Sequence, residues 1–258
     1  MLLSIIALRK VFFIYFMKLL PQLLKSALVR KLAMPLPFFT ARKALLYDLD
    51  GTIIDTDALH LAAWQRTGLE FGFEITAEQL ATVKGLSSKK TLEALLPKEQ
   101  HLIINEASER KFQYLMELTG NVEILGNFTE AYEQLARRNI PFGVCTSARR
   151  DFVDAIIKNV PALKTVLEGK TVCKEMFKEG KPSAEPLRVT LDFMGEVSGR
   201  RIPASSALYV GDGYSDYGAA QNAGMPFLYF CPREEKREVR IPPEIITIKD
   251  HRELLAYI

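Results

Sequence analysis

The sequence predicts an α/β fold, in which a parallel sheet is flanked by helices and carries an all-helical cap inserted after its first strand. Short apolar segments typical of buried strands alternate with helical patterns, and this alternation favours a parallel sheet. Between the first two of these segments lie about 85 residues with almost purely helical patterning, far more than one crossover connection needs. A composition of 48% hydrophobic and 25% charged residues excludes a disordered or collagen-like chain.

Five segments have the apolar composition of strands. The first, residues 44–47, runs into Asp48-Leu49-Asp50 and the turn residues Gly51-Thr52. The others are residues 140–145, 207–210, 226–230 and, as a candidate edge strand, 245–248. The first three end in Asp, Thr-Ser or Gly-Asp. Since open α/β sheets bind ligands at the carboxyl ends of their strands, we expect the functional site there.

The long insertion after the first strand repeats apolar residues three and four positions apart, the spacing of amphipathic helices. Its helical segments are residues 59–71, 77–83, 89–96 and 103–118, and a further helix is expected at 129–138. We therefore expect a helical cap at residues 57–125 and an α/β core made of residues 41–56 and 126–258. Gly126-Asn127 marks the return of the chain to the core.

The first 40 residues differ from the rest of the chain in charge. Residues 1–47 carry eight basic and no acidic side chains, which leaves 26 of the 34 basic residues against all 31 acidic ones in the remainder. The net charge of +3 therefore describes this leader, and the body has no excess of positive charge for binding nucleic acid.

The charge-free runs of the leader, residues 1–8 and 11–17, are shorter than the roughly 20 residues that cross a bilayer. Three interpretations stay open: an amphipathic helix on a membrane surface, an organelle-targeting segment, or an extension upstream of a start at Met17 or Met34. Three widely spaced cysteines fit a reducing compartment, so we expect a cytoplasmic catalytic body unless the leader directs it elsewhere.

Polar residues that follow the strands would share one crevice. Asp48 and Asp50 are two residues apart and project to the same side of an extended chain. The other members of the group are Thr146, Lys181 in the loop before a helix starting near Ser183-Ala184, and the pair Asp212 and Asp216. Several carboxylates in one crevice are costly alone, whereas Mg²⁺ with a phosphate ligand would explain them.

The motifs Asp48-Leu49-Asp50-Gly51-Thr52, Thr146, Lys181-Pro182 and Gly211-Asp212-x-x-x-Asp216 resemble, in order and spacing, the four motifs of the haloacid dehalogenase superfamily. The resemblance covers about residues 44–230 and implies a Rossmann-like core with the helical cap of subfamily I. Residues 55–64 are similar to the β-phosphoglucomutase and sugar-phosphatase branch, and the fourth motif is closer to phosphoglycolate-phosphatase-like relatives.

The resemblance implies a Mg²⁺-dependent phosphatase that acts on a small phosphomonoester through an aspartyl-phosphate. Asp48 would be the nucleophile, and Asp50 the general acid and then the general base. Phosphoryl oxygens would be held by Thr146, Lys181 and the main-chain NH groups of Ser147 and Ala148, which would open a helix. The metal would bind Asp48, Asp212 and the main-chain carbonyl of Asp50. Asp216 would orient Lys181 or a metal-bound water.

Four further residues are weaker candidates for substrate contacts. His60, four residues before Trp64, either packs inside the cap or faces the substrate, as the histidine of the mutase branch does. Lys84 and Lys89 either line a solvated helix start or form a specificity loop for an anionic substrate. Arg149, just after the second motif, would touch the substrate or close on the cap.

The main alternative is a β-phosphoglucomutase-like mutase. Two positions argue against it: Ser88 stands where that branch has an arginine, and Gly211-Asp212 replaces its acidic pair. A dehalogenase is disfavoured because it does not need Asp50, and a non-catalytic binding protein has no support while all the motif residues are present. The expected partner is a small phosphorylated metabolite, with the alcohol and the oligomeric state left open.

Overall fold

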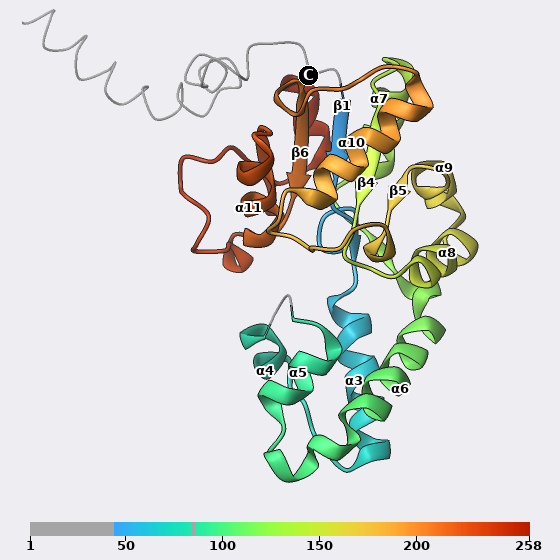
Figure 1. The fold of residues 1–258 in the computed structure, drawn as a ribbon, viewed down its shortest axis with the longest axis vertical. Coiled ribbons are helices and arrows are strands. Elements are labelled where there is room, and N and C mark those ends of the chain that lie inside the picture. The colour runs from blue at the N-terminus through green and yellow to red at the C-terminus, as the bar shows by residue number, and fades with distance from the viewer. Residues whose placement is uncertain (1–43, 84–85) are drawn as a thin grey trace, which may run out of the picture. The chain divides into compact units, whose positions relative to one another are not determined.

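The computed structural model describes residues 44–83 and 86–258 and confirms the predicted α/β fold (Figure 1). Residues Arg42–Leu255 form one compact unit, so the predicted division into a core and a cap stays a prediction. The leader, residues 1–40, and the candidate Lys84 lie outside the described residues. In the parts of the chain that are described, no helix is both long and apolar enough to cross a membrane.

Six parallel strands form the main sheet, in the order β5-β4-β1-β6-β7-β8. Their bounds are β1 Ala44–Tyr47, β4 Phe142–Cys145, β5 Thr171–Val172, β6 Ala207–Gly211, β7 Phe227–Phe230 and β8 Thr247–Ile248. The central strand β1 lies between β4 and β6, with Tyr47 opposite Val144 on one side and Val210 on the other. Because these strands run in the same direction, the residues that follow them emerge at one edge of the sheet.

The sheet is covered by helices because its central strands are apolar on both faces. The helices outside the insertion are α7 Phe128–Arg137, α8 Arg150–Asn159, α9 Lys164–Leu167, α10 Glu185–Ser198 and α11 Tyr214–Ala223. Leu46 and Tyr209 pack with Leu191 of α10 in one buried cluster. On β1, Tyr47 alternates with Leu46, and its ring centroid lies 5.4 Å from that of Phe128 in α7.

The insertion consists of helices with an apolar core of their own. They are α3 Asp57–Phe71, α4 Ala77–Thr82, α5 Ser88–Leu95, the 3₁₀ helix η2 Lys98–Ile103 and α6 Ile104–Glu117. Trp64 of α3, Leu92 of α5 and Ala107 of α6 are members of one buried cluster. Two short strands, β2 Ile54–Asp55 and β3 Glu123–Ile124, pair in an antiparallel ribbon. The chain enters the insertion after β2 and leaves it through β3.

Several elements differ from the sequence predictions. The strand predicted at 140–145 begins at Phe142, and the edge strand at 245–248 shortens to β8. Strands β2, β3 and β5, of two residues each, are too short to show a period in sequence. The helix expected to open at Ser147 and Ala148 begins at Arg150, because the Ala148 main-chain NH donates to the Thr146 hydroxyl at 3.0 Å and closes a side-chain turn first.

Candidate active site

The turn after β1 places two carboxylates at the edge of the sheet. The main-chain NH groups of Ile53 and Ile54 both donate to the Leu49 carbonyl, at 2.9 and 3.1 Å, which folds residues 49–54 tightly behind Asp48. Gly51 has a φ of +82°, and a Cβ there would lie 2.3 Å from Asp212 Oδ2. Glycine is therefore required at this position, because it allows the turn to approach the carboxylate that follows β6.

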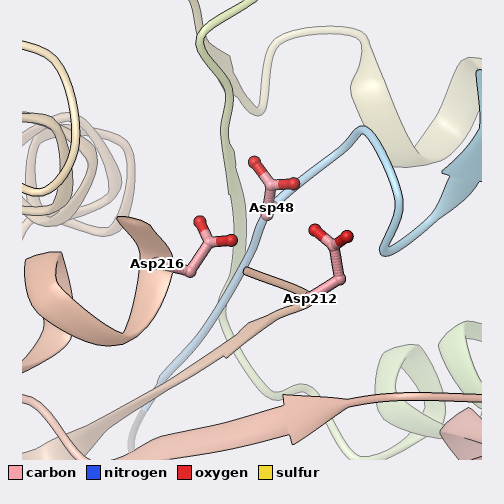
Figure 2. A group of neighbouring side chains, drawn as sticks. All are labelled: Asp48, Asp212 and Asp216. Atoms are coloured by element: carbon pink, nitrogen blue, oxygen red, sulfur yellow. The ribbon is translucent and has the colours of Figure 1, made fainter. Parts of the chain in front are cut away.

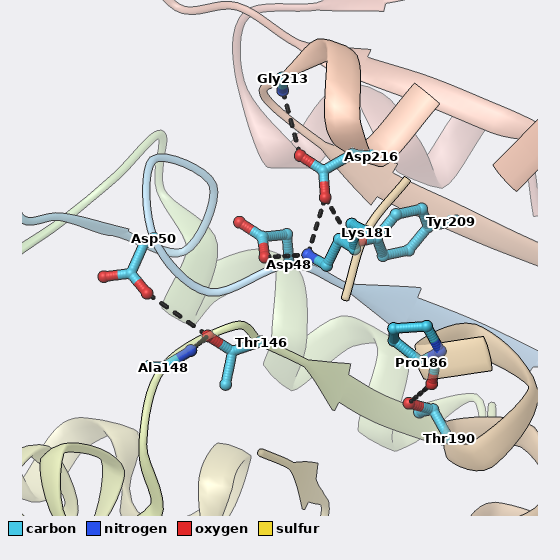
Figure 3. Close-up of polar contacts among 10 residues, drawn as sticks. All are labelled: Asp48, Asp50, Thr146, Ala148, Lys181, Pro186, Thr190, Tyr209, Gly213 and Asp216. Carbon is cyan, nitrogen blue, oxygen red and sulfur yellow. Dashed lines mark hydrogen bonds and ion pairs between the residues drawn. The ribbon is translucent and has the colours of Figure 1, made fainter. Parts of the chain in front are cut away.

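Lys181 joins two carboxylates of the site (Figure 3). Its Nζ contacts Asp48 Oδ1 and donates to Asp216 Oδ1 at 2.7 Å, and its side chain is only 4% exposed. Burial works against the charge on Lys181, but Asp216 and Asp48 outweigh it and raise the pKa of the amine. Lys181 is therefore a permanent buried cation against the proposed nucleophile.

The oxygens of Asp216 are engaged by protein donors. Oδ1 accepts from the Tyr209 hydroxyl at 2.7 Å as well as from Lys181, and Oδ2 accepts from the Gly213 main-chain NH at 3.1 Å. These contacts tie Lys181 to β6 and to the start of α11. Of the two roles expected for Asp216, orienting Lys181 is the one that this geometry favours.

Asp48, Asp212 and Asp216 can each direct a carboxylate oxygen to within 4.8 Å of the others (Figure 2). Burial raises the pKa of Asp48 well above its usual range; Lys181 opposes the shift, while Asp216, Asp212 and Asp50 add to it by repulsion. A divalent cation would relieve this repulsion, and a set of carboxylate oxygens suits Mg²⁺. The residues present therefore fit the predicted metal.

Asp50 is held by two hydroxyl groups. Thr56 donates to its Oδ1 at 2.9 Å, and the Thr146 hydroxyl lies 3.4 Å from its Oδ2. Burial raises the pKa of Asp50, and the Thr56 bond, Lys181, Thr146 and Lys111 oppose the shift. A carboxyl group with a raised pKa beside a nucleophilic carboxylate can carry a proton, as a general acid must. Thr56 is not among the predicted site residues, because its contact with Asp50 depends on how the turn folds back.

A lysine of the insertion is buried beside His60 and Trp64. Lys111 of α6 is 2% exposed, and its Nζ lies 2.7 Å from His60 Nδ1 and 5.3 Å from the centroid of Trp64. Burial lowers the pKa of Lys111 to about 7, with Asp50 opposing the shift. Burial and Lys111 lower the pKa of His60 to about 3, so His60 is neutral and accepts from the lysine.

Lys111 is not among the residues predicted from the motifs, although the sequence carries a signal for it. The buried face of α6 consists of Ile104, Ala107, Ser108, Lys111 and Leu115. A lysine at the centre of such a stripe occupies a core position, where an unpaired charge is rare, and this is a reason to suspect function.

The remaining described candidates are Lys89, Ser147 and Arg149. Lys89 is exposed in the first turn of α5. Ser147 is exposed between Thr146 and α8. The Arg149 guanidinium lies 4.1 Å from the ring centroid of Phe112 and forms ion pairs with Asp151 at 2.7 Å and with Glu109 at 3.7 Å. Arg149 thus contacts α6 of the insertion.

Comparison with known proteins identifies relatives of the chain. The pyrophosphatase PpaX of Bacillus velezensis is 26% identical over 182 residues, covering 70% of this chain and 79% of that protein. The phosphoglycolate phosphatase of Photorhabdus laumondii is 25% identical over 195 residues, 71% of this chain and 78% of that one. The beta-phosphoglucomutase of Bacillus subtilis is 25% identical over 197 residues, with coverages of 71% and 80%.

Solved structures share the fold. CbbY from Rhodobacter sphaeroides, in complex with phosphate, matches with a TM-score of 0.68 at 19% identity and covers 84% of this chain and 99% of its own. A haloacid dehalogenase-superfamily hydrolase of subfamily IA from Geobacter sulfurreducens matches with a TM-score of 0.63 at 24% identity, with coverages of 84% and 96%.

The model of the haloacid dehalogenase-like hydrolase family matches residues 45–230, which is most of the chain. This match and the phosphatases among the relatives confirm the predicted resemblance and the prediction of a phosphoric monoester hydrolase. The chain belongs to the haloacid dehalogenase-like hydrolase family.

Proposed function

We propose that this enzyme is a Mg²⁺-dependent phosphatase that hydrolyses a small phosphomonoester, a sugar phosphate or a similar metabolite, through an aspartyl-phosphate at Asp48. The observation that carries the proposal is the contact between Asp48 and the buried, charged Lys181. Asp50 follows Asp48 by two residues, and the pKa of its carboxyl group is raised. A nucleophile and a proton carrier thus stand side by side. The relatives named as phosphatases support the same chemistry.

In the first step, an oxygen of the Asp48 carboxylate forms a bond to phosphorus while the bond from phosphorus to the ester oxygen breaks. Asp50 gives its proton to the departing alkoxide, which leaves as the alcohol. Thr56 and Thr146 fix the orientation of Asp50 for this transfer. Lys181 offsets the negative charge that Asp48 and the phosphoryl oxygens bring together.

In the second step, Asp50 is a carboxylate and accepts a proton from water as the water oxygen bonds to phosphorus. The bond between phosphorus and the Asp48 oxygen breaks, which restores the carboxylate and releases inorganic phosphate. Asp48, Asp212 and the main-chain carbonyl of Asp50 are the proposed ligands of Mg²⁺. The bound ion would supply positive charge that draws the phosphoryl group toward Asp48. Asp216 positions Lys181 in both steps.

The proposal assigns specificity to the insertion. Residues 57–125 act as a cap over the core of residues 41–56 and 126–258, and Lys111 with His60 meets the part of the substrate beyond the phosphoryl group. A lysine whose pKa lies at about 7, with a neutral imidazole as its partner, can bind an oxygen-rich or anionic leaving group. Thr146, Ser147, Lys84, Lys89 and Arg149 complete the proposed set of substrate contacts.

The proposed site of action is the cytoplasm. The three interpretations of residues 1–40 stay open, and two of them would bring the enzyme to a membrane surface or an organelle.

A mutase is the second candidate, favoured by the similarity to the beta-phosphoglucomutase of Bacillus subtilis. A mutase binds phosphate at both ends of its substrate. Ser88 in the first turn of α5 and the exposed Lys89 provide no bidentate guanidinium for the second phosphate. The phosphatase is therefore preferred.

The test is phosphate release by the full chain, with and without Mg²⁺, from hexose and pentose phosphates, phosphoglycolate, pyrophosphate, nucleotides and β-glucose 1-phosphate. We expect Mg²⁺-dependent release from at least one phosphomonoester and none from the Asp48→Asn variant. Conversion of β-glucose 1-phosphate into glucose 6-phosphate without phosphate release would replace the phosphatase by the mutase. Release that Asp48→Asn retains would refute the assignment of the nucleophile.

A further inference from the structure

A buried histidine near the carboxyl end of the chain contacts the turn that carries Asp50. His251 opens the 3₁₀ helix η8, His251–Ala256, and is fully buried. Its main-chain NH donates to the Gly126 carbonyl at 2.9 Å, and its ring Nε2 lies 2.9 Å from the Thr52 carbonyl oxygen. Thr52 belongs to the chain leaving the sheet for the insertion and Gly126 to the chain returning from it. His251 thus bonds both the outgoing and the returning connection.

The protonation of His251 follows from its surroundings. A carbonyl oxygen only accepts, so Nε2 must carry the hydrogen. Nδ1 has no hydrogen-bond partner among the described residues. The ring stacks on Phe230 at 4.1 Å between centroids and meets Phe128 edge-on at 5.3 Å. Burial lowers the pKa of His251 to about 4, opposed by the Thr52 bond and Asp250, so the ring is a neutral donor at pH 7.

The Thr52 carbonyl depends on this donor. Thr52 is fully buried, and the main-chain NH groups of the turn, from Gly51 to Ile54, bond within the turn itself. The bond to the Thr52 carbonyl comes instead from His251, on a segment almost 200 residues further along the chain. A buried carbonyl without a donor is unfavourable, so loss of the imidazole would favour a different path for the turn.

The surroundings of the ring are closely fitted. Gly126 has a φ of +52°, and a Cβ there would lie 2.8 Å from Phe230 and 3.2 Å from the His251 ring. The neighbouring Asp250 accepts from the Asn127 side chain at 2.6 Å and pairs with Arg252 at 2.7 Å, which anchors the segment against the start of α7. His251 is therefore held rigidly, as a residue that sets the position of another group must be.

We propose that His251 is a positioning residue for proton transfer by Asp50: by holding the Thr52 carbonyl it fixes the turn on which Asp50 stands opposite Asp48. The proposal rests on the proposed function, because it acts through the general acid. It implies that His251 matters most for substrates whose leaving group needs a proton. An error of about 1 Å in the placement of a catalytic group can slow a reaction about 100-fold.

The experiment compares two substrates of similar size in the full chain at saturating Mg²⁺, because the same turn carries the Asp50 carbonyl proposed as a metal ligand. Benzyl phosphate releases an alcohol and needs the proton of a general acid, whereas p-nitrophenyl phosphate releases a stable phenolate and does not. His251→Phe keeps the ring stacking and removes the donor to Thr52. We expect it to lower kcat/KM, which covers only the steps up to release of the leaving group, about 10- to 100-fold for benzyl phosphate and less than about 3-fold for p-nitrophenyl phosphate.

Three controls define the result. His251→Gln, whose amide nitrogen can donate to the same carbonyl, should keep both rates within about 3-fold of the wild type. Asp50→Asn should show the same selectivity in kcat/KM with a larger loss. His101→Phe removes another ring nitrogen that lies near a main-chain carbonyl, that of Leu96 at 3.2 Å within the insertion, and should leave the ratio of the two rates unchanged.

Equal losses on the two substrates, a His251→Gln variant as impaired as His251→Phe, or an unimpaired His251→Phe would each overturn the proposal. If circular dichroism shows that His251→Phe does not fold, His251→Met serves in its place, since a flexible apolar side chain fills the site without a donor. A wild-type chain that releases phosphate from neither these esters nor the metabolites refutes the proposed function itself and is recognised by failing before any substitution is made.

Discussion

Replacing Lys181 by methionine tests the electrostatic centre of the site. The Lys181 side chain is 4% exposed, and those of Asp48 and Asp216 are 9% and 4% exposed. At the 2.7 Å that separates Lys181 Nζ from Asp216 Oδ1, the Coulomb attraction is about 6 kcal/mol for an effective dielectric constant of about 20. Desolvation offsets much of this in the intact pair, but Lys181→Met loses the attraction and leaves two buried carboxylates.

We therefore expect Lys181→Met to lower the free energy of unfolding by about 3 to 5 kcal/mol. Asp216→Asn, combined with it, removes one of the stranded charges. The double variant should then lose about 2 kcal/mol less than the sum of the two single variants. Turnover by Lys181→Met should fall at least about 100-fold, because the charge on the phosphoryl oxygens loses its compensation.

The assay is urea unfolding at pH 7 in EDTA, followed by circular dichroism, for the wild type, both single variants and the double variant. Lys89→Met, at an exposed position in α5, is the matched control and should change the unfolding free energy by less than about 0.5 kcal/mol. Additive effects of Lys181→Met and Asp216→Asn, or a Lys181→Met variant no less stable than the control, would refute the coupling.

Three further predictions concern the metal, the insertion and acid. EDTA should stop phosphate release and Mg²⁺ should restore it, whereas Asp212→Asn should need at least about 10-fold more Mg²⁺ for half-maximal rate; a rate unaffected by metal would exclude the ligand assignment. Lys111→Met should raise KM for the preferred metabolite about 10-fold, and an unchanged KM would contradict the role given to Lys111. Its unfolding free energy at pH 7 should change by less than about 1 kcal/mol, since the Lys111 Nζ bonds a neutral imidazole rather than a carboxylate. Because the pKa of His251 is lowered to about 4, the unfolded chain binds a proton first as pH falls below about 6.5. This histidine should therefore remove about 2 kcal/mol of stability between pH 7 and pH 5. In urea unfolding, the free energy of His251→Gln should fall correspondingly less over this range, and an equal fall would contradict the lowered pKa.

The sequence predicts the motif residues because their proximity follows from strand order. Asp48 and Asp50 are two positions apart on one turn, and Asp212 follows a strand that neighbours β1 in a parallel sheet. The strand order of the Rossmann-like sheet therefore brings these residues together, independently of their side-chain contacts. Lys181, in a loop, is located in the sequence by its motif, and its contacts with Asp48 and Asp216 appear only in the structure.

The hydroxyl groups that hold the carboxylates follow no such rule. Thr56 reaches Asp50 through the fold of a turn, and Tyr209 reaches Asp216 from within a buried strand, where its sequence context is that of an ordinary core residue. Short ribbon strands such as β2 and β3 have no sequence period. Lys111 is the exception, because a lysine on the apolar face of a helix can be recognised without a structure.

The claim that Asp48 is the nucleophile is tested most directly by trapping the intermediate. The full chain is mixed with Mg²⁺ and the best substrate of the metabolite panel, quenched rapidly and treated with borohydride, which reduces an acyl phosphate to an alcohol. Mass spectrometry of the peptide that spans residues 44–66 should then find homoserine at position 48, and only when substrate was present. An unmodified Asp48 in samples that turn over substrate, or reduction at Asp50 instead, would contradict the mechanism.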